Sequence, residues 1–363
     1  MSDSPDTDFL IIGGGVAGLS AGAALAGLGH VIVVEAEAQL GHHASGRSAA
    51  LYEAEYGAPA TVALARASGE ALAAMGALSP RGLLLVAQAH QAAAFETDCA
   101  GLRMERLTPA EALALLPILH PERVALAGYS EAAQNIDTDL VLQTFARRLR
   151  QQGGSIRTGQ PVTALRATAD GWAVTLGTKG ETLTARHIVN AAGAWADRIA
   201  RMAGLPGIGL QPFRRSIAQL PAPDGHDIRA WPMVINAGET WYAKPEAGKW
   251  LVSPADEDPA EPHDAFADDM VLAEGLARYE EMVTVPVTRV ETSWAGLRSF
   301  APDRTLVLGR DPLNPSFLWC AGQGGQGFLS SAGAARVMAE AAGGEASGFP
   351  PKILAALSPA RFR

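Results

Sequence analysis

Residues 13–18 have the types and the spacing of a phosphate-binding turn. They read Gly13-Gly14-Gly15-Val16-Ala17-Gly18 and fit the pattern G-x-G-x-x-G. In this pattern Gly13 permits a tight turn, Gly15 lets the backbone approach a pyrophosphate, and Gly18 lets a helix pack closely on a strand. Glu35 follows about 20 residues later, where a carboxylate accepts the hydroxyls of a ribose. The sequence therefore predicts a dinucleotide site.

The segments around this turn must form a strand, a helix and a second strand. Residues 8–12 predict a buried strand that stops at the glycines, and residues 31–34 predict a second one that stops at Glu35. Between them, residues 16–28 are rich in alanine and leucine and predict a helix. Strand, helix and strand within about 30 residues form a βαβ unit with a right-handed crossover.

Three later segments are small or glycine-rich, so their backbone could also approach a cofactor: residues 41–50, 190–195 and 320–327. The glycine motif alone does not distinguish NAD from FAD. A long, bent cofactor needs contacts from separate parts of the chain, which favours FAD. The expected contact residues are Gly13, Gly15, Val16, Ala17, Gly18, Glu35, Ala36, Ser45, Gly46, Arg47, Ser48, Ala49, Val162, Ala192, Gly193, Trp195, Gly322, Gly324, Gly325, Gln326 and Gly327.

The composition excludes several classes of protein. The 363 residues are 48% hydrophobic and 18% charged, which excludes a disordered or fibrous chain. The net charge of −9 argues against nucleic-acid binding. Cys99 and Cys320 are too few for a disulfide scaffold or a four-thiolate site. The acidic start has no signal-peptide features and no apolar run reaches 18 residues, so we expect a cytoplasmic protein without a transmembrane segment.

A chain of this length favours two domains. Helices are expected at residues 61–75, 108–116 and from Asp137 to near Gly153, and strands at 82–86, 155–157, 162–167, 172–176, 182–185 and 187–193. Residues 206–295 are rich in proline and aromatic side chains, and residues 305–333 return to strand, glycine-rich turn and helix. We predict an α/β fold: a Rossmann-like FAD-binding domain of the glutathione-reductase type, interrupted by a β-rich α+β substrate domain. The FAD-binding domain takes residues 1–74, 137–205 and 297–363, and the substrate domain takes 75–136 and 206–296.

These motifs resemble the D-amino-acid-oxidase-like superfamily of FAD enzymes, which includes glycine and sarcosine oxidases. The resemblance covers essentially the whole chain. Within this superfamily the chain is most similar to the bacterial catabolic D-arginine dehydrogenases, in residues 46–50, 56–57, 135–139, 214–216, 231–233, 242–245, 253–255 and 292–300. Several of these stretches lie in the insertion, where such folds vary with substrate.

The resemblance implies which residues meet the substrate. Arg298 matches the arginine that binds the substrate carboxylate, a task for which the guanidinium fork is suited. Arg215 matches a second arginine of the pocket, although the adjacent Arg214 could take its place. Tyr242 matches a tyrosine whose hydroxyl meets the same carboxylate, and Tyr56 matches a mobile active-site tyrosine. The backbone at Gly325 matches the carbonyl near the substrate amine.

Three positions depart from the D-arginine dehydrogenases. Leu83 stands where those enzymes have a glutamate, Leu51 where they have an imidazole, and Leu329 where they have a glutamine. A guanidinium buried there without a carboxylate would cost several kcal/mol, ~3–5. We therefore expect neutral, hydrophobic substrates. Two alternatives stay open: a one-residue slip would place Leu84 in the pocket, and another acid, Glu53 or Glu55, could supply a counter-charge.

No metal is expected. His42 and His43 are adjacent, but no carboxylate or thiol stands at ligand spacing, and neighbouring side chains on an extended segment diverge. Cys320 is expected to be an apolar strand residue beside the cofactor. The acidic residues 256–269 are expected to form a solvated loop.

The expected reaction is FAD-dependent oxidative deamination of a D-amino acid. Hydride leaves the α-carbon for the flavin, and the imine hydrolyses to a 2-oxo acid and ammonia. The partners are then a small amino acid and an electron acceptor that the sequence does not identify. One alternative is oxidation of a secondary amine of the sarcosine or glycine type, or of a 2-hydroxy acid. The other is a non-catalytic FAD-binding assembly protein.

Overall fold

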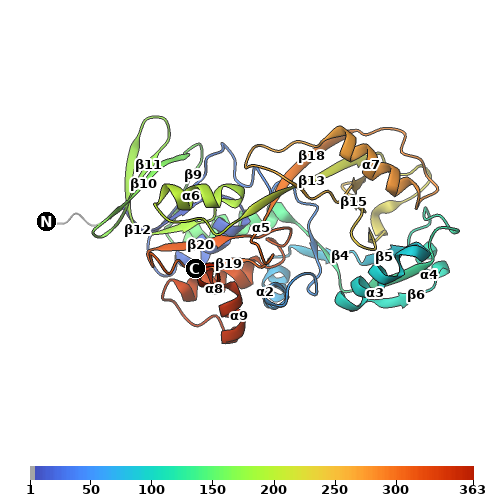
Figure 1. Ribbon diagram of the computed structural model, residues 1–363, viewed down its shortest axis with the longest axis horizontal. Helices are drawn as coiled ribbons and strands as arrows, with labels where there is room; N and C mark the ends of the chain where they lie inside the picture. Colours follow the sequence, from blue (N-terminus) through green and yellow to red (C-terminus); the bar gives the residue numbers. More distant parts are fainter. Residues whose placement is uncertain (1–4) are drawn as a thin grey trace.

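The computed structural model describes residues 5–363, and its strands fall mainly into two large sheets (Figure 1). The first sheet has eight strands: β1 (Thr7–Ile12), β2 (Val31–Val34), β9 (Ser155–Arg157), β10 (Val162–Thr168), β11 (Gly171–Leu176), β12 (Glu181–Asn190), β19 (Val307–Arg310) and β20 (Phe317–Ala321). β1 pairs in parallel with β2, and α1 (Val16–Leu25) connects them. The predicted βαβ unit is confirmed.

One long strand replaces two predicted ones. Residues 182–185 and 187–193 were expected as separate strands, but β12 runs through both. Its first half pairs antiparallel with β11, and its second half pairs in parallel with β1 and β20. No glycine or proline interrupts residues 181–190, so the backbone continues straight from a hairpin into the central sheet.

Helices cover the first sheet. α1 packs against α5 (Thr138–Gln151) and α8 (Ser331–Ala341), while α2 (Pro59–Ala74) packs against α8 and α9 (Pro351–Leu357). α6 (Ala196–Met202) lies beside β10 and β12. Asp137 caps α5 by accepting a hydrogen bond from the Leu140 backbone N–H at 2.9 Å. These helices bury the apolar side chains on the faces of the sheet.

The second sheet has nine strands: β5 (Leu83–Ala87), β6 (Glu105–Leu107), β7 (Leu126–Ser130), β13 (Gln211–Leu220), β14 (Met233–Asn236), β15 (Tyr242–Glu246), β16 (Lys249–Ser253), β17 (Asp258–Pro259) and β18 (Thr292–Phe300). α3 (Ala92–Gly101), α4 (Pro109–Leu115) and α7 (Asp269–Glu280) accompany it (Figure 1). β5 and β14 join the two separate chain segments by pairing in parallel. A small third sheet contains β3 (Leu51–Tyr52), β4 (Leu78–Pro80) and β8 (Gln134–Ile136).

We propose the two large sheets as the cores of the two domains. The strands of the first come from residues 7–34, 155–190 and 307–321, and those of the second from residues 83–130 and 211–300. The boundary predicted at residue 296 falls inside β18, whose nine residues all pair with β13 of the second sheet. The proposed boundary therefore moves to Phe300.

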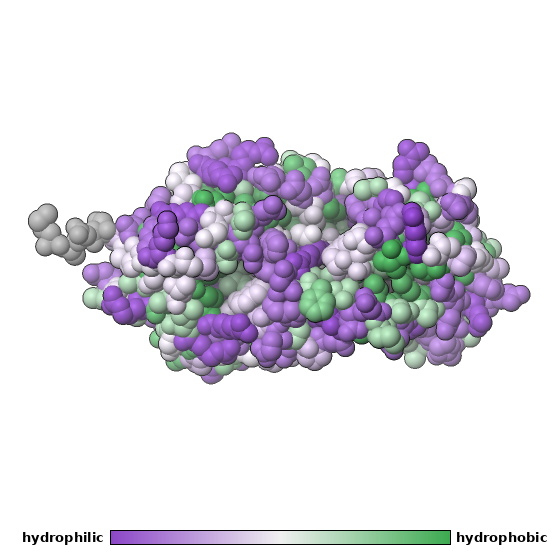
Figure 2. Space-filling view, turned by 90° about the horizontal axis from the view of Figure 1, so that it is seen from above, coloured by the Kyte–Doolittle hydropathy of each residue, from purple (hydrophilic) through white to green (hydrophobic). Residues whose placement is uncertain are grey.

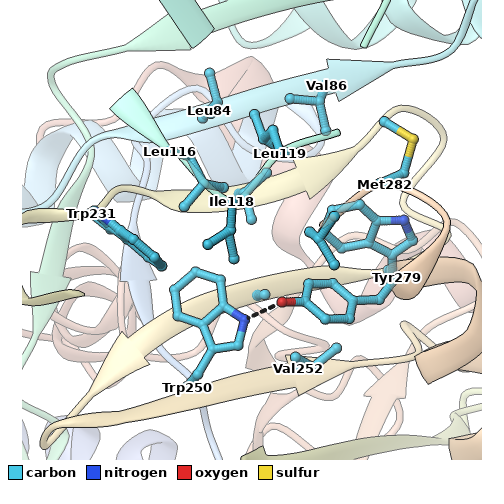
Figure 3. Packing of buried hydrophobic residues seen from close by; sticks show 14 of the residues in the cluster. Leu84, Val86, Leu116, Ile118, Leu119, Trp231, Trp250, Val252, Tyr279 and Met282 are labelled. Carbon is cyan, nitrogen blue, oxygen red and sulfur yellow. Dashed lines mark hydrogen bonds between the residues drawn. The ribbon is translucent and has the colours of Figure 1, made fainter. Parts of the chain in front are cut away.

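Aromatic residues of the insertion form the core beneath the second sheet (Figure 3). Trp231 and Trp250 pack edge to face, with ring centroids 5.4 Å apart. The Trp250 Nε1–H donates a hydrogen bond to the Tyr279 hydroxyl at 2.8 Å, so both polar atoms are satisfied in the interior. The aromatic-rich segment is thus a packed core that supports the strands of the second sheet.

Polar side chains cover much of the face seen in Figure 2, and apolar side chains appear there in scattered groups. Within residues 5–363, no helix has the length and apolar character needed to cross a membrane.

Candidate active site

The glycine turn is shaped by close backbone packing. Gly13 has a φ of +112°, and a Cβ atom there would lie 2.4 Å from the Ala191 carbonyl oxygen. A Cβ atom on Gly18 would lie 1.9 Å from the Gly13 carbonyl oxygen. Only glycine therefore lets β1, α1 and the segment after β12 meet. α1 begins at Val16, and its N-cap residue Gly15 supplies no side-chain hydrogen bond to the start of the helix.

Glu35 lies beside this turn at the end of β2. Its carboxylate accepts hydrogen bonds from the backbone N–H groups of Gly14, at 2.6 Å, and of Glu37, at 2.9 Å. The Val16 N–H donates to the Ser45 Oγ at 3.0 Å, which ties the segment 41–50 to the start of α1. The glycine turn and Glu35, the two parts of the predicted dinucleotide motif, are therefore in direct contact.

A cavity of about 440 Å³ runs from the glycine turn to Arg298. Of the 21 predicted cofactor contacts, it is lined by all but Gly18, Gly46 and Gln326. Gly18 packs against the turn, and Gly46 lies against Gly41, whose carbonyl oxygen a Cβ atom would meet at 2.6 Å. The Gln326 side chain donates to the Tyr56 carbonyl oxygen at 3.0 Å. Further lining residues that sequence reasoning missed include Gln160, Pro161, His263 and Ala265.

The expectation that no carboxylate lies near the two histidines was wrong. Residues 40–47 form successive turns and not an extended segment, so the rings of His42 and His43 lie 4.9 Å apart. Glu37 Oε1 is 3.0 Å from His43 Nε2, and Asp264 Oδ2 is 3.7 Å from His42 Nε2. Glu37, His42 and His43 have the mutual spacing of a metal site, but they are also part of the wall of the 440 Å³ cavity.

A second cavity of about 90 Å³ adjoins the first, and Ser48, Ala49, Arg215, Tyr242, Arg298 and Gly325 line both. The remaining wall consists of Ala50, Leu51, Glu53, Tyr56, Leu83, Leu102, Met233, Ile235, Glu239 and Leu329. All eight residues predicted for substrate contact thus meet at one small cavity. Leu84 packs instead into the core on the other face of β5, so Leu83 is the residue that meets the cavity.

Arg298 is one of two arginines that line both cavities. It lies on β18, above Gly325, where a Cβ atom would be 2.9 Å from the guanidinium carbon. Burial alone would lower the Arg298 pKa, but the nearby Tyr242, Tyr56 and glutamate side chains outweigh it and raise the pKa. Within residues 5–363, no protein group accepts a hydrogen bond from this guanidinium. Its donors are therefore free for an anionic ligand.

Arg215 and Arg214 point to different places. Arg215 is buried and lines both cavities, and it donates to the Asp256 carbonyl oxygen at 2.8 Å and to Glu257 Oε1 at 3.2 Å. Arg214 donates to Asp258 Oδ2 at 2.7 Å. Asp256 is buried, and its carboxylate accepts a hydrogen bond from the Ser216 backbone N–H at 2.6 Å. The prediction of a solvated loop over residues 256–269 is therefore wrong at Asp256.

Tyr56 meets a carboxylate that sequence reasoning missed. Its hydroxyl donates to Glu239 Oε2 at 3.2 Å. Burial is the main cause that raises the Tyr56 pKa, with Glu239 adding to it, so the phenol is neutral and can donate. Glu53, which also lines the cavity, is buried and accepts hydrogen bonds from Ser130 Oγ at 2.8 Å and from the Glu55 N–H at 3.2 Å.

A buried lysine holds the segment that separates the two cavities. Lys244 is 1% exposed, and its Nζ donates to the carbonyl oxygens of Ala49, at 2.8 Å, and of Ala50, at 3.3 Å. It also pairs with Glu246 Oε2 at 2.8 Å. Burial lowers the Lys244 pKa, and Glu246 opposes that shift. Lys244 thus fixes the small-residue loop in place, although it touches neither cavity.

Four residues of the small cavity that the sequence analysis did not predict show little in the sequence that would have identified them. Met233 and Ile235 alternate with buried neighbours along β14, so a strand assignment would have placed both on one face. Glu239 lies in the loop after β14, and Leu102 follows α3, where no periodicity applies.

The chain matches a known family over most of its length. The family model DAO, described as FAD dependent oxidoreductase, matches residues 8–341. The chain belongs to the DAO family. It is therefore an FAD-dependent oxidoreductase, which confirms the cofactor that the small-residue segments favoured and the superfamily that the motifs resemble.

Several known proteins are similar to this DAO-family chain. FAD-dependent oxidoreductase domain-containing protein 1 of Xenopus laevis is 25% identical over 307 residues, which cover 72% of this chain and 60% of that protein. Glycine oxidase of Geobacillus kaustophilus is 25% identical over 349 residues, which cover 89% of each chain. The chain thus spans about 60% of the length of the first relative and most of the second.

Solved structures share the fold of this chain. The crystal structure of glycine oxidase from Geobacillus kaustophilus superposes with a TM-score of 0.82 at 22% identity, over 97% of this chain and 98% of that one. L-alpha-glycerophosphate oxidase from Mycoplasma pneumoniae, with FAD bound, has a TM-score of 0.81 at 20% identity, over 93% and 95%. At these identities the likeness establishes the fold alone.

The larger cavity fits the cofactor of the DAO family. The close-packed glycines leave a cradle that Cβ atoms would fill, and Glu35 stands beside it. At the other end, Ser299 and Arg298 of β18 line the cavity beside Gly322, Gly324 and Gly325.

Proposed function

We propose that this protein oxidises D-amino acids with neutral, hydrophobic side chains to 2-oxo acids and ammonia. One observation carries the proposal: the Arg298 guanidinium lies in a small cavity beside the cofactor cavity, with donors that no described protein group uses. An α-amino acid brings the carboxylate that such a guanidinium binds. The D configuration rests on the resemblance of the site segments to the D-arginine dehydrogenases.

The cofactor would be held by the glycine turn and the loops that follow other strands. Gly13 and Gly15 would admit the pyrophosphate, and Glu35 would accept the ribose hydroxyls. When bound, FAD accepts the hydride that the substrate carbon loses. The remaining work of the chain is to bind the substrate, orient it and exclude water.

Substrate binding begins at the carboxylate. Arg298 can donate two parallel hydrogen bonds, and the Tyr242 hydroxyl lines the same wall. Gly325 lies directly beneath the guanidinium, so the carbonyl of that segment is close to the carbon that bears the amine. We expect the amine to lose its proton to water. The product imine then hydrolyses in solution.

The side-chain end of the cavity is mainly apolar. Leu51, Leu83 and Leu329 line it together with Leu102, Met233 and Ile235. Each substrate methylene buried there stabilises binding by about 0.8 kcal/mol. Glu53 is the carboxylate closest to these leucines in sequence, but burial raises its pKa and protein donors already satisfy it. Glu55 pairs with Arg66 at 2.7 Å and does not line the cavity.

The test is anaerobic bleaching of the flavin by a panel of ligands. The panel contains D- and L-leucine, D-methionine, D-phenylalanine, D-arginine, sarcosine and D- and L-lactate. We expect the D-hydrophobic amino acids to reduce the flavin with the highest efficiency. Faster reduction by D-arginine would show that Glu53 or Glu239 supplies a counter-charge, and faster reduction by sarcosine or lactate would replace the substrate class. No reduction by any ligand would indicate a non-catalytic flavoprotein.

A further inference from the structure

The small cavity contains a carboxylate without a cationic partner. Glu239 Oε2 accepts a hydrogen bond from Tyr56, and no lysine, arginine or histidine of residues 5–363 forms an ion pair with it. The same cavity contains Arg298, which forms no ion pair within that range either. The two groups line the same cavity, and the Glu239 charge helps to raise the Arg298 pKa, but they form no direct ion pair with one another. A ligand that carries both a positive and a negative charge would give Glu239 and Arg298 one oppositely charged partner each.

Glu239 is held in place by its loop. The backbone φ of Glu239 is +52°. Residues other than glycine adopt this left-handed conformation only when the surrounding structure imposes it. The Glu239 N–H donates to the Asn236 carbonyl oxygen at 2.9 Å, and the Thr240 hydroxyl donates to Asn236 Oδ1 at 2.6 Å. The neighbouring Gly238 N–H donates to Asp98 Oδ2 at 2.7 Å, which anchors the loop to α3. The carboxylate is therefore presented to the cavity by a fixed backbone.

We propose that Glu239 binds the α-ammonium group of the substrate while Arg298 binds its carboxylate. The inference rests on the proposed function, because it requires an amino acid in this cavity. Tyr56 completes the amine site. Its proton is directed to Glu239, so the lone pairs of its oxygen can accept a hydrogen bond from the ammonium. A 2-hydroxy acid has a neutral hydroxyl at that position and gains no ion pair, so Glu239 selects amines over hydroxy acids.

Glu53 does not compete for this role. Ser130 and the Glu55 backbone already donate to its two oxygens, whereas the Glu239 carboxylate has Tyr56 alone as a side-chain donor within the described residues. Glu53 directly follows β3, whereas Glu239 belongs to the loop that follows β14.

The experiment measures binding to the FAD-loaded enzyme with ligands that cannot react. 2-Aminoisobutyrate and trimethylacetate have the same shape, but the first has an ammonium where the second has a methyl group, and neither has a hydrogen on the α-carbon. Dissociation constants come from perturbation of the flavin absorption spectrum. Wild type should bind 2-aminoisobutyrate more tightly. Glu239→Gln should weaken that binding by about tenfold or more and leave trimethylacetate within about threefold. The glutamine still accepts the Tyr56 hydrogen bond, so the loop is kept.

Two controls separate the outcomes. Glu55→Gln removes a nearby carboxylate that pairs with Arg66 outside the cavity, and both dissociation constants should stay unchanged. 5-Aminopentanoate and hexanoate place an ammonium or a methyl group at the side-chain end. Suppose that Glu239→Gln loses the preference for 5-aminopentanoate over hexanoate but keeps that for 2-aminoisobutyrate over trimethylacetate. Glu239 would then bind a cation at the side-chain end, and the inference would be overturned. An unchanged ratio for 2-aminoisobutyrate and trimethylacetate would overturn it while the proposed function stands. If wild type binds neither, the carboxylate site itself is wrong and both proposals fail.

Discussion

Replacing Arg298 by methionine should remove most of the affinity for the substrate carboxylate and leave FAD bound. Methionine has a similar length and fits above Gly325, so the fold has no reason to change. The guanidinium has free donors in a small cavity, and loss of one partner from such a charge pair costs about 2–5 kcal/mol. Because about 1.4 kcal/mol corresponds to a factor of ten, kcat/KM should fall by ~30- to 4,000-fold.

The assay is anaerobic stopped-flow reduction of the flavin by a D-amino acid, together with the dissociation constant of trimethylacetate. Arg289→Met is the matched control. Arg289 lies just before β18, its side chain is 68% exposed, and it pairs with Glu291 at 3.0 Å. It should behave as wild type. If Arg298→Met keeps its efficiency within about threefold of wild type, the loss is below about 1 kcal/mol and Arg298 is not the carboxylate site.

Three further predictions follow from neighbouring contacts. Leu83→Glu should raise the ratio of D-arginine to D-leucine efficiency by at least about tenfold, since a charged hydrogen bond is worth about 1.5–3 kcal/mol; an unchanged ratio would mean that residue 83 does not meet the side chain. Gly325→Ala should raise the KM of D-amino acids by about 10- to 100-fold, because the added Cβ displaces the Arg298 guanidinium; wild-type KM would contradict the contact. Tyr279→Phe should lower the free energy of unfolding in urea by about 1–3 kcal/mol, because it strands the Trp250 N–H, while the flavin spectrum stays unchanged.

The sequence alone determined the part of the protein that depends on local spacing. The glycine pattern, the two apolar strands and Glu35 lie within 30 residues, and their roles follow from backbone sterics and helix geometry. FAD could be inferred because the further small-residue segments are also local patterns. The hairpin at 171–190 was misjudged at one point, since nothing local showed that β12 would continue into the central sheet.

Only the tertiary structure decided which side chains share the small cavity. Arg298 is on β18, Leu83 on β5 and Tyr56 in the loop after β3, and sheet pairing between distant segments brings them together. Arg215 and Arg214 are adjacent on β13 and point to opposite faces, and only the structure shows that the face of Arg215 meets the cavities. Glu239 had no sequence signal, because its place depends on a left-handed backbone that Asp98, 141 positions away in the chain, helps to anchor through Gly238. Long-range hydrogen bonds of this kind leave no periodicity in the sequence, and here they place a carboxylate in the wall of the small cavity.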